Sequence, residues 1–295
     1  MANRNKLSTA IKDHTRPPSD TSEEEQAAAP DAQRWYSRLV GSRGGRALIT
    51  IAFGIILLVA WQLIGMSLSP ILLSYPTAVA GQAAILIGDG TLGAAFASTL
   101  QPFALGYVLG ALVGIPLGLF VGRYRMMEAA VGPYITAGYA TPLVALLPLF
   151  IVWFGIGFTV KVAIVFTLTV FPIVINTWRG VQGVPKTTVE VGTAFGASSG
   201  EIMRKIIMPA TLPHIMTGLR LGVGRAVIGV IIGEFFTAVS GLGGIIINAA
   251  NSFQTARMFV PIIGILCWGV IVTRLVGIAE KKLAPWHIAM AGRQQ

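Results

Sequence analysis

Long apolar runs separated by short polar stretches dominate the pattern of this chain. A helix needs roughly 20 apolar residues to cross the hydrocarbon core of a bilayer, and a spanning helix satisfies its own backbone hydrogen bonds. Six runs of about this length predict six helices, at about residues 47–66, 100–121, 136–155, 161–177, 221–240 and 259–278. Pro142 and Pro148 interrupt the third run, and a tight turn at Gly155 and Gly157 separates it from the fourth.

The two ends of the chain differ from this apolar body. Residues 1–46 carry an acidic cluster and a pair of prolines, and they show no apolar periodicity, which is typical of a disordered tail. We therefore expect a tail at 1–46, a transmembrane domain at 47–280 and a second tail at 281–295. No cleavable signal peptide is expected, because the first apolar run begins only near Ala47 and is long enough to span.

Composition agrees with an all-α integral membrane protein whose surroundings are the lipid bilayer. Of the 295 residues, 54% are hydrophobic and 12% are charged, whereas soluble domains have roughly 25% charged residues. The net charge is +10, but the basic residues flank apolar runs and form no stripe, so no nucleic-acid partner is expected.

The distribution of basic residues predicts the orientation of the spans. If the amino terminus is cytoplasmic, 18 of the 22 Lys and Arg residues fall in tails and loops on the cytoplasmic side. Only Lys161 and Arg257 fall on the opposite side, while Arg220 and Arg225 lie in the cytoplasmic end of the fifth run. Because cytoplasmic loops are enriched in Lys and Arg, both termini are predicted to be cytoplasmic.

A polar segment at 178–213 separates the fourth and fifth runs, and this orientation places it in the cytoplasm. Thr187 with Glu190, and again Ser198 with Glu201, have the spacing of a capping box, in which a hydroxyl and a carboxylate satisfy the first backbone N–H groups of a helix. Two short helices are therefore expected in the segment.

The ends of these two helices are also predicted. Gly196 is expected to take a left-handed conformation that stops the first helix, and Pro209 with Pro213 to stop the second before the chain re-enters the membrane. A helix–bend–helix element of this length is typical of a docking site for a partner protein.

The spacing in this segment resembles the EAA loop of the permease subunits of bacterial ABC importers. Glu190-Val191-Gly192 is followed after three residues by Gly196, and after nine more by Ile206-x-Met208-Pro209. The family pattern is EAA, three residues, G, nine residues, I-x-L-P. The chain departs from it in Val191-Gly192, which replace the two alanines, and in Met208, which replaces leucine.

Other short motifs extend the resemblance over about residues 70–275. Together they are similar to the nitrate, sulfonate and taurine branch of the permease family. They are Tyr75-Pro76-Thr77, Pro142-Leu143, Leu147-Pro148-Leu149, Trp153-Phe154-Gly155, Phe171-Pro172 and Gly241-Leu242-Gly243.

The resemblance implies a type I ABC importer permease fold with a cytoplasmic coupling loop at 178–213, in a bacterial inner membrane. It implies three protein partners: cytoplasmic ABC ATPase subunits that bind the ATP, an extracytoplasmic solute-binding protein, and a second copy of the chain. The implied cargo is a small solute such as nitrate, a sulfonate or taurine, with a pyrimidine-type vitamin precursor as the alternative. The residues implied in ATPase docking are Glu190, Val191, Gly192, Ala194, Phe195, Gly196, Ile206 and Pro209.

Two of these residues have a second interpretation. Glu190 either completes only a helix cap or also orients the docking surface, and Phe195 either contacts the ATPase or packs back on the bundle.

Catalytic and metal-binding patterns are not found in the sequence. The chain has no GxxxxGK[ST] phosphate loop, its three histidines are scattered, and its single cysteine, Cys267, allows no disulfide within the chain. We therefore expect a transport subunit without a cofactor or metal of its own, and not a membrane enzyme. A secondary transporter is the less favoured alternative, since no internal repeat is found.

Glu234 is the one acidic residue expected in the middle of a span, and an intramembrane carboxylate is costly enough to suggest a function. It either lines the translocation path or a gate, with Arg225 of the second copy, Thr237 or water as its partner, or lies near the outer end in a solvated vestibule. Gly241 and Gly243 follow, and they either shape an outer gate or simply reverse the chain.

Overall fold

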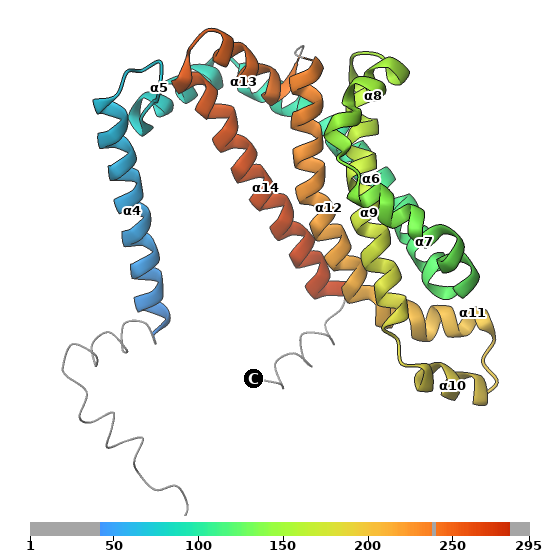
Figure 1. The fold of residues 1–295 in the computed structure, drawn as a ribbon. Helices are drawn as coiled ribbons and strands as arrows, with labels where there is room; N and C mark the ends of the chain where they lie inside the picture. Colours follow the sequence, from blue (N-terminus) through green and yellow to red (C-terminus); the bar gives the residue numbers. More distant parts are fainter. Residues whose placement is uncertain (1–41, 238–239, 284–295) are drawn as a thin grey trace, which may run out of the picture. The chain divides into compact units, whose positions relative to one another are not determined.

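The computed structural model describes residues 42–237 and 240–283, and Figure 1 shows the fold. Most of the tail expected at 1–46, and all but the first residues of the tail at 281–295, lie outside the described residues. Within the described part every regular element is a helix. These are α4 (Arg43–Ser67), α5 (Pro76–Gly88), α6 (Thr91–Arg123), α7 (Arg125–Ala140), the 3₁₀ turn η1 (Leu143–Leu146), α8 (Leu147–Phe154), α9 (Phe158–Gln182), α10 (Lys186–Ala194), α11 (Ser199–Ile202), the π-helical η2 (Met203–Ile207), α12 (Met208–Thr237), α13 (Gly241–Asn251) and α14 (Thr255–Leu283).

The chain divides into a unit at 1–63 and a larger unit at 64–295. Helix α4 forms nearly all of the described part of the first unit. It is largely apolar, and most of its large hydrophobic side chains are exposed. A helix with this surface is suited to lipid.

Five helices are long and apolar enough to cross a membrane: α4, α6, α9, the helix at 199–237 and α14. They coincide with the runs expected at 47–66, 100–121, 161–177, 221–240 and 259–278. A sixth span exists if α7 and the η1–α8 segment count as one. The expectation of an all-α protein with about six apolar spans is confirmed.

The run expected at 136–155 differs from a single straight helix. Helix α7 and the segment at 143–154 meet at an angle of 85°. Thr141, which precedes Pro142, has the extended backbone angles φ −64° and ψ 133°. A residue before proline is pushed out of the helical region by the proline ring, and this explains the break.

Helix α9 packs closely against α6 along a row of glycines. A Cβ atom added at any of these glycines would lie 2.6 to 2.9 Å from an atom of α9, so larger residues would force the two helices apart. The glycines recur every fourth residue, which places them on one face of α6. They are Gly106, Gly110, Gly114, Gly118 and Gly122.

Helix α12 packs on α9 in the same manner. Gly218 and Gly222 of α12 contact Ile173 of α9, and Gly229 contacts Leu168. Small residues of this kind let membrane helices approach at backbone distance, which increases van der Waals contact. Helices α6, α9 and α12 therefore form the packed centre of the larger unit.

Helices α11, η2 and α12 run on as one helix from Ser199 to Thr237. The expected stop at Pro209 and Pro213 is therefore wrong. Pro209 is the second residue of α12, and Pro213 lies inside it. A proline in a regular helix clashes with the carbonyl of the residue four positions earlier, which for Pro209 is Lys205. Lys205 lies within the π-helical turn Met203–Ile207, which is wider than a regular α-helical turn.

The loop expected at 178–213 is shorter as a result. Helix α9 continues to Gln182, and the next long helix already begins at Ser199. Only α10 and its two connections lie between them, so the element contains one short helix and the start of a long one.

Candidate functional site

Helix α10 begins at Lys186, directly after Pro185. The capping box expected from Thr187 is wrong, since Thr187 is the second residue of the helix and no side chain caps its amino end. Pro185 is itself the residue before the helix, with φ −58° and ψ 131°, so the helix begins two residues earlier than the capping-box spacing predicts.

The second capping box is confirmed. Ser198 Oγ accepts a hydrogen bond from the N–H of Glu201 at 3.3 Å, and Glu201 Oε2 accepts one from the N–H of Ser198 at 3.0 Å. Lys205 donates to the other carboxylate oxygen of Glu201 at 2.8 Å. The start of the long helix is therefore well defined by local side chains.

Gly196 ends α10, as expected, in a left-handed conformation with φ 77°. Its N–H donates to the carbonyl of Thr193 at 2.9 Å, and the N–H of Ala197 donates to the carbonyl of Gly192 at 3.0 Å. These two bonds form a Schellman motif, which satisfies the last carbonyls of a helix and reverses the chain.

One face of α10 packs on the start of the long helix. A Cβ atom added at Gly192 would lie 2.6 Å from Cδ1 of Ile206. The first part of the motif, which contains Gly192, therefore packs against its last part, which begins at Ile206. Val189 packs beside them against the buried side chains of Ile202 and Ile207. The absence of a side chain at Gly192 lets α10 lie close to its neighbour.

The opposite face of α10 is exposed. Glu190, Val191, Ala194 and Phe195 all lie on the surface, and Phe195 is 88% exposed. The interpretation that Phe195 packs back on the bundle is therefore wrong. Pro209, the last residue of the motif, is half-buried.

Glu234 lies in a buried polar cluster near the opposite end of the bundle from α10. Its Oε1 accepts a hydrogen bond from Oγ1 of Thr99 at 2.8 Å, and its Oε2 accepts one from the N–H of Gly243 at 2.8 Å. The Nζ of Lys161 lies 3.6 Å from Oε1. The same Nζ donates to Oγ of Ser240 at 3.1 Å.

This arrangement differs from the partners considered for Glu234. The hydroxyl of Thr237 donates to backbone carbonyls of its own helix rather than to the carboxylate. Within the chain, Arg225 lies 5.6 Å over the ring of Tyr139, and a pairing of Glu234 with Arg225 of a second copy stays a prediction. The carboxylate is fully buried, so the solvated-vestibule interpretation is wrong. A charge this deep is tolerable only when paired and hydrogen-bonded, as it is here.

Gly241 and Gly243 lie directly on the carboxylate. A Cβ atom at Gly241, where φ is 88°, would lie 1.8 Å from Oε1 of Glu234, and one at Gly243 would lie 2.7 Å from the Cβ of Glu234. Both glycines therefore leave room for Glu234.

Sequence reasoning missed Thr99 and Lys161 as members of this cluster. The distribution of basic residues indicates Lys161 only as a charge that sets the topology, although its place at the start of an apolar run is a usable signal. Thr99 carries no signal, because it lies 135 residues from Glu234 along the chain.

A polar groove of about 350 Å³ lies between α7, α9 and α12 and was also missed. Its lining combines hydroxyl, amide and guanidinium groups with aromatic rings. The lining residues are Thr136, Tyr139, Pro172, Ile175, Asn176, Trp178, Arg179, Gln182 and Leu221.

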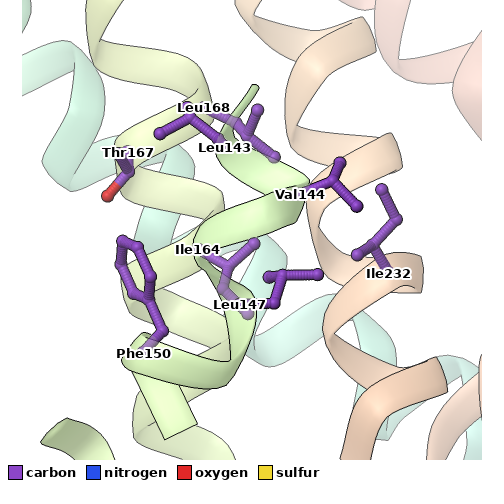
Figure 2. A pocket seen from close by; sticks show the side chains of 8 residues that line it. All are labelled: Leu143, Val144, Leu147, Phe150, Ile164, Thr167, Leu168 and Ile232. Carbon is purple, nitrogen blue, oxygen red and sulfur yellow. The ribbon is translucent and has the colours of Figure 1, made fainter. Parts of the chain in front are cut away.

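A second pocket, beneath the η1–α8 segment, is almost wholly apolar (Figure 2). Leu147 and Ile164 are buried there, and Ile232 of α12 closes one side. The single hydroxyl in its lining, Thr167, donates to its own helix. This pocket therefore serves packing rather than the binding of a polar solute.

Comparison with known proteins shows the family of the chain. Residues 114–285 match the family "Binding-protein-dependent transport system inner membrane component". The formylaminopyrimidine transport permease protein ThiX of Halalkalibacterium halodurans is 31% identical over 83% of this chain and 98% of its own. The putative aliphatic sulfonates transport permease protein SsuC of Bacillus subtilis is 30% identical over 80% of this chain and 87% of its own.

The fold is similar to that of a solved amino acid ABC transporter. The TM-score is 0.52 at 19% identity, over 68% of this chain and 96% of that one. The family, the apolar helices and this fold together describe a multi-pass transport component of an inner membrane. The chain therefore belongs to the family of binding-protein-dependent transport system inner membrane components, the permease subunits of ABC importers.

Proposed function

We propose that α10 is the docking element through which a cytoplasmic ABC ATPase drives this permease. The observation that carries the proposal is the exposure of Phe195, 88%, on a helix whose other face is held against the bundle. An aromatic side chain left on the surface in a polar segment gains most from burial against a partner. Val191, one helical turn away, is 56% exposed and extends the same face.

The orientation that this proposal requires has α10 and both termini in the cytoplasm. The charge distribution supports it, since Lys186, Arg204 and Lys205 lie in or beside the docking element. Helix α13 then lies at the extracytoplasmic side, where a solute-binding protein would deliver its cargo.

The translocation path is completed by a second copy of the chain. The polar groove between α7, α9 and α12 presents groups that suit a polar solute, and we assign it to that path. In a two-fold dimer the same groove would contribute from both copies.

The cargo is a small polar solute, and an aliphatic sulfonate is the first candidate. Arg179 in the groove would attract a sulfonate, and the similarity to SsuC supports this class. A formylaminopyrimidine is the second candidate, supported by the similarity to ThiX. Equilibrium binding of taurine and of a formylaminopyrimidine to the cognate binding protein separates the two classes.

Replacement of Phe195 tests the docking. The variant Phe195→Asp should reach the membrane in normal amount, but it should lose its ATPase during co-purification in detergent and lose solute uptake. A buried carboxylate would replace the aromatic contact at the interface, and this is the reason for the loss.

Thr193→Ala is the matched control. Thr193 is exposed on the same helix, two residues away and therefore on a different face. It should retain both ATPase and uptake. Full ATPase retention and uptake in Phe195→Asp would refute the docking role.

A further inference from the structure

One continuous helix connects the docking element to the Glu234 cluster. The helix runs from Ser199, beside α10, to Thr237, a length of about 58 Å at 1.5 Å per residue. Helix α10 packs on its beginning through Gly192 and Ile206, while Glu234 projects near its end. Figure 1 shows α10 and α11 at one end of α12 and α13 at the other.

At that far end, the first turn of α13 is held by side chains of other helices. The N–H groups at the start of a helix lack partners within the helix, and a serine before the helix usually supplies one. Ser240 occupies this position but makes no cap, and its hydroxyl accepts from Lys161 instead. Glu234 of α12 accepts from the N–H of Gly243, and Thr99 of α6 accepts from the N–H of Leu242 at 2.9 Å.

The hydroxyl of Thr99 also connects the two acceptors. It donates to Glu234 while it accepts from Leu242, so α6, α12 and α13 share one hydrogen-bonded network. Lys161 of α9 balances the charge of the carboxylate. Gly241 and Gly243 leave no space between α13 and Glu234. This contact between α13 and α12, called the joint below, therefore has little room to slide.

We propose that Glu234 and Thr99 are positioning residues that fix α13 to α12, so that a displacement of the long helix imposed at α10 is passed to α13 on the opposite side of the membrane. This proposal rests on the docking role of α10. It assigns Glu234 to the transmission of movement, and it explains why the carboxylate is enclosed by protein rather than open to the solute.

The test uses the complete transporter, with permease, ATPase and loaded binding protein, in proteoliposomes. Thr99→Val keeps the shape of the side chain but removes the hydroxyl, and Thr99→Ser keeps the hydroxyl. Thr99→Val, which leaves the pair of Glu234 and Lys161 in place, should retain the ATPase and its basal ATP hydrolysis. The amount of solute taken up per ATP hydrolysed should fall by about tenfold, as expected for the loss of one coupling interaction. Thr99→Ser should stay near the wild-type ratio.

A cluster that only braces the fold would give a different result. Uptake and ATP hydrolysis would then fall together, in proportion to the amount of folded transporter, and this outcome would overturn the proposal. Full retention of the ATPase and of uptake by Phe195→Asp in the same system would instead refute the docking role of α10. The two failures are therefore distinguishable.

A distance measurement tests the joint without altering it. Spin labels at Phe236→Cys of α12 and Ala250→Cys of α13, in a Cys267→Ala background, report the separation of the two helices; all three positions are exposed. The separation should be the same with and without ATP. A shift on ATP binding would show that α13 moves independently of α12 and would overturn the proposal.

Discussion

Glu234 shows how a charged side chain is tolerated inside an apolar bundle. Both carboxylate oxygens accept hydrogen bonds, and a lysine lies within 3.6 Å of one of them. Removal of one partner from a buried ion pair typically costs about 3–5 kcal/mol, because the other charge is left unpaired. A substitution of any one of the side chains around Glu234 is therefore expected to be costly, whereas substitutions of exposed residues on the same helix are not.

Gly196 is constrained for a different reason, its left-handed backbone with φ 77°. A left-handed conformation costs roughly 1–2 kcal/mol for most residues, and Asn tolerates it better than a β-branched residue. Gly196→Val should therefore loosen the Schellman turn and expose the loop to trypsin at Lys186 and Arg204. Limited proteolysis of the purified permease should show faster cleavage than in the wild type.

Gly196→Asn is the control for this prediction and should be cleaved at close to the wild-type rate. Equal rates for Gly196→Val and the wild type would mean that the left-handed turn does not hold α10 in place.

At the scale of elements, the packed centre depends on backbone approach between helices. The glycines of α6 form one face, and α9 presents its branched side chains to it, such as Val165, Thr169 and Ile173. Partly exposed charges hold other elements, as where Arg220 of α12 pairs with Glu280 of α14. Close packing in the centre makes the bundle sensitive to small increases in side-chain volume.

Two glycines of α6 allow a matched test of this packing. A Cβ atom at Gly118 would lie 2.6 Å from the side chain of Thr177 and 2.7 Å from the backbone carbonyl of Val174. Gly118→Ala should therefore lower the thermal unfolding temperature in detergent, since overpacking costs about 1–3 kcal/mol.

Gly93→Ala, in the same helix, has open space at that position. It should leave the unfolding temperature unchanged or raise it slightly, because alanine favours a helix over glycine. If both variants lowered the unfolding temperature by a similar amount, the loss would come from α6 itself and not from its packing against α9, and the prediction would be wrong.

At the scale of the whole molecule, the proposed docking helix α10 lies at one end of a long helix, and the buried Glu234 cluster lies at the other. Helices α10 and α13 are separated by the length of α12 (Figure 1). The long helix exceeds the roughly 30 Å of a hydrocarbon core. In the proposed orientation its first turns therefore extend beyond the bilayer on the α10 side.

The proposed orientation predicts which end is accessible from outside the cell. In a Cys267→Ala background, a membrane-impermeant maleimide should label Ser252→Cys in intact spheroplasts. It should label Thr193→Cys only after lysis. Both positions are exposed and lie outside the apolar helices, one after α13 and one in α10. Labelling in the reverse order would refute the orientation.

Features set by neighbouring residues were predictable from the sequence. Apolar runs of spanning length anticipated the five long helices, because the bilayer constrains length and polarity together. The left-handed Gly196 and the Ser198–Glu201 capping box followed from local backbone chemistry. At Thr187 a competing local signal, Pro185, moved the start of the helix.

The sequence by itself determined the membrane class, the long apolar helices and the motif that spans α10 and the start of the next helix. Only the tertiary structure decided that the helix passes through Pro209 and Pro213, that Phe195 remains exposed, and that Glu234 meets Thr99 and the first turn of α13. The physical reason is that these outcomes depend on which helices lie against one another. Neighbours in space satisfy the polar groups and fill the volumes, and they come from residues more than a hundred positions apart.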